Sequence, residues 1–154
     1  MDRKRGQTAT EYLIILFVVI VIALVVVVAM GQFPGIGEQT GQRGSAAYWS
    51  AQDIGIASYA FADDGGRLVL NNNQRNAVAV TNVTIGVASS DDTPITLGPG
   101  GSQTVDLGAG NDCPPGQTYS FDVSIEYTDQ QTGATYTITG GGQSLEGTCA
   151  SSLS

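Results

Sequence analysis

Residues 118–128 read Thr-Tyr-Ser-Phe-Asp-Val-Ser-Ile-Glu-Tyr-Thr, and apolar and polar side chains alternate along most of this stretch. A period of two places successive side chains on opposite faces of a β-strand. One face then carries only apolar side chains, which are Tyr119, Phe121, Val123, Ile125 and Tyr127. The stretch therefore predicts one strand that buries one face and exposes the other to water.

Short segments of similar character lie on both sides of this stretch, separated by turns rich in Gly, Pro, Asn and Asp. We expect further strands at residues 67–71, 95–97, 103–107, 134–139 and 144–149, and one strand or a pair of strands at 77–88. Within 77–88 the phase of the apolar residues changes after Val80, and a bulge near Thr81 and Asn82 would reconcile the two halves. About seven short strands are typical of a small, immunoglobulin-like β-sandwich.

The N-terminal part of the chain has a different character. Residues 12–30 contain no charged or strongly polar side chain. As a helix rising about 1.5 Å per residue, they would extend roughly 28 Å, close to the thickness of a bilayer core. The predicted fold class is therefore α+β, with a long N-terminal apolar helix over residues 7–31 that spans a membrane, followed by a small immunoglobulin-like β-sandwich head.

The basic residues nearest to this apolar run all precede it. Arg3, Lys4 and Arg5 lie before the run, and the next basic residue is Arg43. Positive charges stay on the cytoplasmic side, so we expect the N-terminus inside the cell and the bulk of the chain outside. An ordinary secretory signal has a shorter apolar stretch, with the cleavage site after it. Here Gly6 precedes the run, and cleavage there would leave the helix on the mature protein.

The residues around Gly6 also carry a family resemblance. Residues 4–13, Lys-Arg-Gly-Gln-Thr-Ala-Thr-Glu-Tyr-Leu, resemble the class III signal peptide of archaeal type IV pilins. The resemblance implies that a membrane-bound prepilin peptidase cleaves between Gly6 and Gln7. Ala9 stands where that family commonly has Ser, and Ile15 where it commonly has Leu, and both differences conserve size.

Glu11 falls at the fifth position of the mature chain in this resemblance. A carboxylate costs roughly 2.5–3.5 kcal/mol at bilayer depth and less near the interface, so a partner is expected. Cleavage creates a free amine on Gln7, and Glu11 could pair with that amine in a neighbouring subunit and set the axial register. The alternative is a carboxylate stabilised by its own helix dipole or by the basic leader.

The resemblance implies a structural subunit and no enzyme. The residues that make the resemblance specific lie within 3–16. The leader, the apolar helix and the β-sandwich head together follow the order of parts in that family. It implies a homopolymeric filament with the apolar helices in its core, which serves adhesion or surface attachment. The other implied partners are the membrane, the prepilin peptidase, a pilus assembly ATPase and a platform protein. The precursor would lie in the cell membrane and the mature subunit in an extracellular filament.

The expected parts are a leader at 1–6, the apolar helix at 7–31, a kinked helical or linker segment at 32–66, and the β-sandwich head at 67–154. A second hypothesis is a single-pass anchored extracellular domain that binds a ligand or sugar and does not polymerise. Within the linker, the segment 50–62 remains ambiguous, because Ile54-Gly55-Ile56 could open a strand.

Tyr48 and Trp49 lie in an amphipathic segment of this linker. They would form a membrane-interface belt or, as we prefer, pack under the head. Pro34 and the glycines around it either kink a helix or form a flexible linker.

The composition excludes several classes of function. The chain has 14 acidic and 6 basic residues, a formal charge of −8 and no His. An acidic surface argues against nucleic acid as a partner. Without His, the commonest general base and transition-metal ligand are missing, so we expect no catalytic site, cofactor or metal. Asp63-Asp64 and Asp91-Asp92 could bind Ca²⁺, but they lack EF-hand spacing and are interpreted as solvated turns.

Two covalent modifications are predicted. Cys113 and Cys149 are the only cysteines, and an even count in an exported chain favours a disulfide over two buried thiols. Asn82-Val83-Thr84 is an N-glycosylation sequon, which is common in the surface filaments that the chain resembles. Asn82 lies inside an expected strand and would face inward if it shared the phase of Val80, so its accessibility remains open.

Overall fold

The computed structural model describes residues 5–31 and 36–153, with side chains over 10–25 and 41–153. The chain divides into two compact units, Met1–Glu38 and Gln39–Ser154. Helix α1 (Arg5–Gly31) belongs to the first unit, and helix α2 (Ile36–Ser50) lies mostly in the second.

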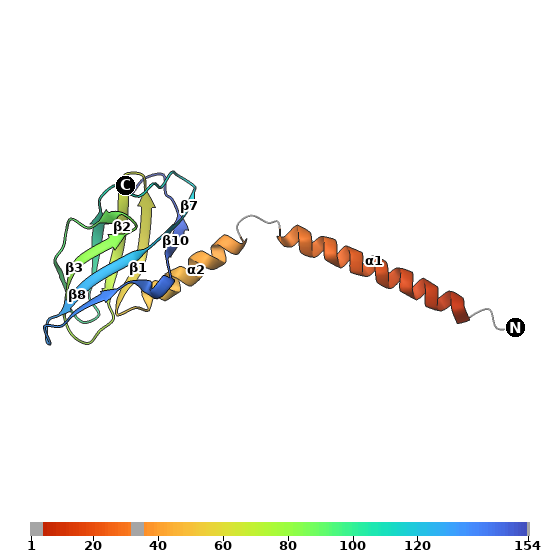
Figure 1. Cartoon of the computed structure of the whole chain (residues 1–154), viewed down its shortest axis with the longest axis horizontal. Coiled ribbons are helices and arrows are strands. Elements are labelled where there is room, and N and C mark those ends of the chain that lie inside the picture. The colour runs from red at the N-terminus through yellow and green to blue at the C-terminus, as the bar shows by residue number, and fades with distance from the viewer. Residues whose placement is uncertain (1–4, 32–35, 154) are drawn as a thin grey trace. The chain divides into compact units, whose positions relative to one another are not determined.

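The second unit is a β-sandwich of antiparallel strands (Figure 1). Its described part contains ten strands. They are β1 (Ile54–Ala62), β2 (Gly65–Asn72), β3 (Val78–Ile85), β4 (Ala88–Ser89), β5 (Ile95–Leu97), β6 (Ser102–Leu107), β7 (Thr118–Phe121), β8 (Val123–Asp129), β9 (Thr135–Ile138) and β10 (Leu145–Thr148). One sheet has the order β1-β2-β6, a second pairs β10 with β7, and the third has the order β4-β3-β8-β9 with β5 paired to β3.

The predicted fold class is wrong in its helical part. We expected an α+β protein with a long apolar helix over residues 7–31 that spans a membrane, but no helix among the described residues is long and apolar enough to do so. The protein is mostly β. The predicted β-sandwich is confirmed, and the ambiguous segment 50–62 contains strand β1.

The stretch 118–128, which we predicted as one strand, is divided between two sheets. Strand β7 ends and β8 begins on either side of Asp122. Strand β7 pairs with β10, whereas β8 pairs with β3 and β9. The apolar phase continues across the break, and the fully or nearly fully buried members are Tyr119, Val123, Ile125 and Tyr127. One continuous periodic stretch thus contributes to two sheets of the sandwich.

The bulge predicted within residues 77–88 is present in β3. The register between β3 and β8 shifts between Val80 and Asn82. Val80 and Val83 are three positions apart and would lie on opposite faces of a regular strand. Because of this shift, both point into the core. Asn82 is exposed.

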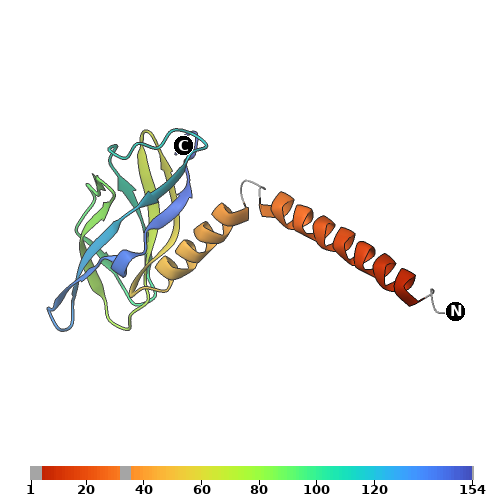
Figure 2. The same cartoon turned by 45° about the vertical axis from the view of Figure 1, so that its right-hand side comes forward.

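Helix α2 is fixed to the sandwich by hydrogen bonds as well as by apolar contact. Trp49 is fully buried, and its indole Nε1 donates to the carbonyl oxygen of Ser144 at 3.2 Å. Ser45 donates through Oγ to the same carbonyl at 2.9 Å and accepts the N–H of Glu146 at 3.0 Å. These contacts satisfy the N–H of Glu146 on β10 and the carbonyl of Ser144 just before the strand, so α2 lies along this edge of the small sheet (Figure 2).

The Trp49 ring packs directly against the backbone of Gly140. A Cβ atom at residue 140 would lie 2.6 Å from two ring carbons, and the φ of Gly140 is +69°. Tyr48 donates its hydroxyl to the Gly140 carbonyl at 2.9 Å. Both aromatic side chains therefore pack under the head, as we preferred from the sequence.

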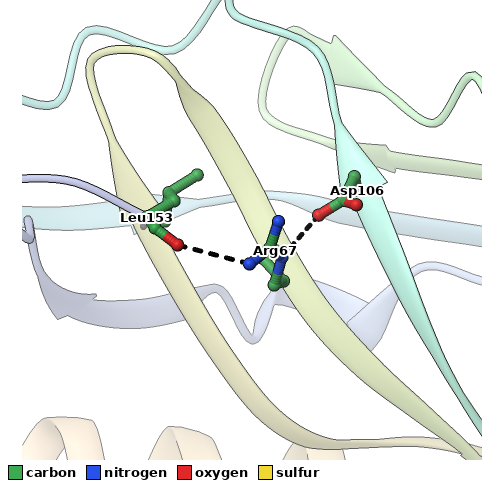
Figure 3. A network of polar contacts seen from close by, with 3 residues as sticks. All are labelled: Arg67, Asp106 and Leu153. Atoms are coloured by element: carbon green, nitrogen blue, oxygen red, sulfur yellow. Dashed lines mark hydrogen bonds and ion pairs between the residues drawn. The ribbon is translucent and has the colours of Figure 1, made fainter.

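The C-terminal segment is held against β1 and β2. The N–H of Ala150 donates to the Phe61 carbonyl at 2.8 Å. Arg67 on β2 lies between Asp106 on β6 and the carbonyl of Leu153, at 2.6 Å and 3.2 Å (Figure 3). The Asp106 carboxylate raises the pKa of Arg67. Because the ion pair is exposed, it adds little to stability, and Arg67 holds the tail through its hydrogen bond to Leu153.

Candidate functional site

The described side chains of α1 form a continuous apolar surface. Thirteen large apolar residues between Tyr12 and Val25 have exposed fractions from 41% to 67%. They are Tyr12, Leu13, Ile14, Ile15, Leu16, Phe17, Val18, Val19, Ile20, Val21, Ile22, Leu24 and Val25. In the sandwich, by contrast, the exposed large apolar residues among the described ones are Val87 and Tyr136.

This apolar surface surrounds the helix on every side. Successive residues of an α-helix are about 100° apart, so eleven consecutive apolar residues from Tyr12 to Ile22 leave no polar face. A helix that is apolar all round is found buried, and exposed apolar patches of this kind mark interaction sites. One partner lying along one side would cover only part of it. Burying this surface therefore requires contacts with partners on several sides of the helix.

The predicted processing and register residues lie at the start of α1. Arg5 is its first residue and Gly6 and Gln7 follow in its first turn, whereas Arg3 and Lys4 lie outside the described residues. Glu11 is exposed and forms no hydrogen bond or ion pair with the described residues. Its carboxylate directly precedes the apolar surface and is available to a group from another molecule.

The predicted disulfide between Cys113 and Cys149 is confirmed. Two backbone hydrogen bonds lie beside it: Cys149 donates to the carbonyl of Gln117 at 2.7 Å, and Gly116 donates to the carbonyl of Cys149 at 2.9 Å. The disulfide thus closes a loop of the chain that is also tied by hydrogen bonds. Asp63 accepts the N–H of Cys113 at 3.1 Å through Oδ1.

Asn82, the residue of the predicted sequon, lies on the outer face of the sheet formed by β4, β3, β8 and β9. The register shift in β3 places it opposite Glu126, and both side chains are exposed. The sequence left its direction open, and the bulge decides it. Glycosylation of Asn82 stays a prediction, now with an accessible side chain.

The two aspartate pairs are turn residues. Asp63 and Asp64 connect β1 with β2, and Asp91 and Asp92 follow β4. All four side chains are exposed. Among the described residues, no three His, Cys, Asp or Glu side chains gather closely enough to hold a metal ion.

Sequence reasoning missed one feature of Tyr119. Its apolar periodicity assigned it to the core, and its ring is indeed buried. Its hydroxyl, however, reaches a groove beside α2. Only the pairing of β7 with β10 and the position of α2 bring the walls of that groove together, and no local sequence pattern encodes either.

No protein-family model and no curated protein matched this chain. The resemblance carried by residues 4–13 therefore depends on those residues alone.

Proposed function

We propose that this chain is a structural subunit of a type IV pilus-like surface filament, made as a precursor and cleaved after Gly6 by a prepilin peptidase. Copies of α1 pack against one another and bury their apolar side chains, while the β-sandwich faces the surroundings. The filament serves adhesion or surface attachment. The partner of the apolar surface is thus other copies of the same chain.

The observation that carries the proposal is the apolar surface on every side of α1. Helices arranged around one another can cover all sides at once, and each fully buried Leu, Ile, Val or Phe side chain contributes about 1.5–3 kcal/mol. A pair of helices would leave the outer sides exposed. Open-ended assembly from a repeated contact covers every subunit except those at the ends.

Three further observations support the same proposal. Residues 4–13 match a signal that leaves the helix on the mature chain, which assembly through α1 requires. A disulfide-linked sandwich is suited to an oxidising environment outside the cell. After cleavage at Gly6 the subunit keeps 3 basic and 13 acidic residues, a formal charge of −10, and this acidic surface keeps separate filaments apart.

The test is to shear surface material from cells that make the chain, image it, and sequence the N-terminus of the protein in it. We expect filaments whose subunits begin at Gln7. Chains that begin before Gly6 and stay in the membrane fraction would instead support an anchored domain that does not polymerise. Soluble chains that begin after Val25 would contradict assembly through α1.

Replacing Glu11 by alanine is expected to leave cleavage and export intact and to reduce filament yield. The physical reason is the loss of the carboxylate that pairs with the amine of Gln7 in a neighbouring subunit. The measurement compares filament yield with the N-terminal sequence of exported material. Glu11→Gln is the matched control, because it keeps the size and removes only the charge, and it should show the same defect. Normal filaments from both variants would contradict the register role.

A further inference from the structure

A groove lies within the second unit, between α2 and the strands β1, β7 and β10. Its volume is about 430 Å³, within the range of small-molecule sites. Six of the residues that line it carry polar side chains. They are Gln42, Arg43, Tyr59, Tyr119, Glu146 and Thr148.

Tyr119 is the residue that distinguishes this groove from an ordinary surface depression. The residue is only 9% exposed, and its ring stacks on Phe121 and meets the edge of Phe61. Its hydroxyl forms no hydrogen bond with any described residue. Since every buried side-chain polar atom in the described part has a partner, this hydroxyl must open into the groove. A mostly buried side chain thus presents one unpaired polar atom to whatever occupies the space.

Gly147 keeps the space around this hydroxyl open. A Cβ atom at residue 147 would collide with the Tyr119 hydroxyl oxygen. Any larger residue would therefore displace the tyrosine or fill the groove. Burial raises the pKa of Tyr119 and also that of Tyr59, so both hydroxyls keep their protons at neutral pH.

The other polar groups of the groove are partly fixed by the protein. Tyr59 donates its hydroxyl to the carbonyl of Glu146 at 2.9 Å, which leaves its oxygen able to accept. Gln42 donates through Nε2 to Thr148 Oγ1 at 3.0 Å. These hydrogen bonds hold the side chains in place before a ligand arrives, which lowers the entropic cost of binding.

The charges in the groove balance. Arg43 contributes one cation and Glu146 one carboxylate, and neither forms an ion pair with a described residue. A ligand with net negative charge would meet Glu146 and the acidic surface of the protein, and a cation would meet Arg43. A neutral ligand with many hydroxyl groups, each able to donate and to accept, matches both groups and the tyrosine hydroxyls.

We propose that this groove binds a neutral polyhydroxylated ligand of the sugar class. The ligand accepts a hydrogen bond from the Tyr119 hydroxyl and makes further contacts with Arg43 and Glu146. The inference concerns the second unit alone and holds whether or not the chain polymerises, so it can fail independently of the proposed filament.

The experiment is a ligand-observed NMR titration of the full chain in a detergent without a sugar headgroup. The probes are cellobiose, lactose, maltose and N,N′-diacetylchitobiose. We expect saturable binding of at least one of them. Tyr119→Phe keeps the ring and removes the hydroxyl, and one lost hydrogen bond should weaken that binding roughly three- to tenfold. Tyr136→Phe, on the exposed edge strand β9, is the matched control and should bind as the unchanged chain does.

Three results would overturn the inference. The first is no saturable binding of any of the four disaccharides up to their solubility limits. The second is equal binding by Tyr119→Phe and the unchanged chain. The third is that glucuronate or glucosamine binds more tightly than glucose, which would exclude a groove built for a neutral ligand. Because Tyr119→Phe removes a hydroxyl without a protein partner, its thermal unfolding should match that of the unchanged chain.

Discussion

Replacing both cysteines by alanine is expected to lower the free energy of unfolding of the second unit by about 4 kcal/mol. Cys113 and Cys149 are 36 positions apart, and closing a loop of that length removes about this much chain entropy from the unfolded state. Both side chains are also buried, so alanine loses packing as well. For a unit of this size the melting temperature should fall by roughly 10–20 °C.

The measurement is thermal unfolding followed by circular dichroism, with and without a thiol reductant. Reductant should lower the melting temperature of the unchanged chain towards that of the doubly substituted chain. It should leave the doubly substituted chain unchanged, which controls for other effects of the reagent. Equal melting temperatures for the two oxidised chains would show that the hydrogen bonds of Cys149 and Gly116 hold this region without the disulfide.

The sequence predicted most strands of the sandwich because each buries one face. Residues 95–97 were predicted as a strand with the bounds that the structure has, and residues 103–107 with bounds one residue shorter. Successive side chains of a strand point to opposite faces, one towards the core and one towards water. The alternation of apolar and polar residues is therefore visible within each short stretch of sequence. The bulge in β3 was predictable for the same reason, since a change of phase needs an inserted residue.

The sheet change at Asp122 was not predictable from the same pattern. Alternation reports which face of a residue is buried and says nothing of which strand lies beside it. Val123 and Tyr119 share one apolar phase, and yet they belong to strands with different partners. Strand pairing depends on contacts that are distant in sequence, so one periodic stretch can serve two sheets.

The candidate sites also divide into those that the local sequence indicates and those that depend on contacts between distant residues. The disulfide and the exposed carboxylate of Glu11 follow from residue type and position in the chain, and the sequence indicated both. The groove beside α2 depends on Ser45 and Trp49 meeting the edge of β10. The prediction of a membrane-spanning helix is wrong, because no helix among the described residues is long and apolar enough to cross a membrane, and ten strands make up most of the described structure.

A single lysine on any side of the apolar surface of α1 is expected to raise strongly the concentration at which filaments assemble. Val18 and Ile20 are about 200° apart around the helix, so they face nearly opposite directions. If neighbouring copies cover every side, Val18→Lys and Ile20→Lys each bury an unpaired charge at a cost of about 3–5 kcal/mol. The concentration needed for assembly should then rise by about 10²-fold to several thousandfold for both variants.

The measurement is the concentration of processed subunit at which filaments form, read by sedimentation and electron microscopy. Val18→Leu and Ile20→Leu are the matched controls, since they keep an apolar side chain of similar volume, and both should assemble. The two lysine variants also separate an open assembly from a simple dimer. In a dimer only one side of α1 is covered, so one of the two lysines would point to water and cost little. Loss of assembly in one variant with normal assembly in the other would therefore contradict a helix surrounded by its copies.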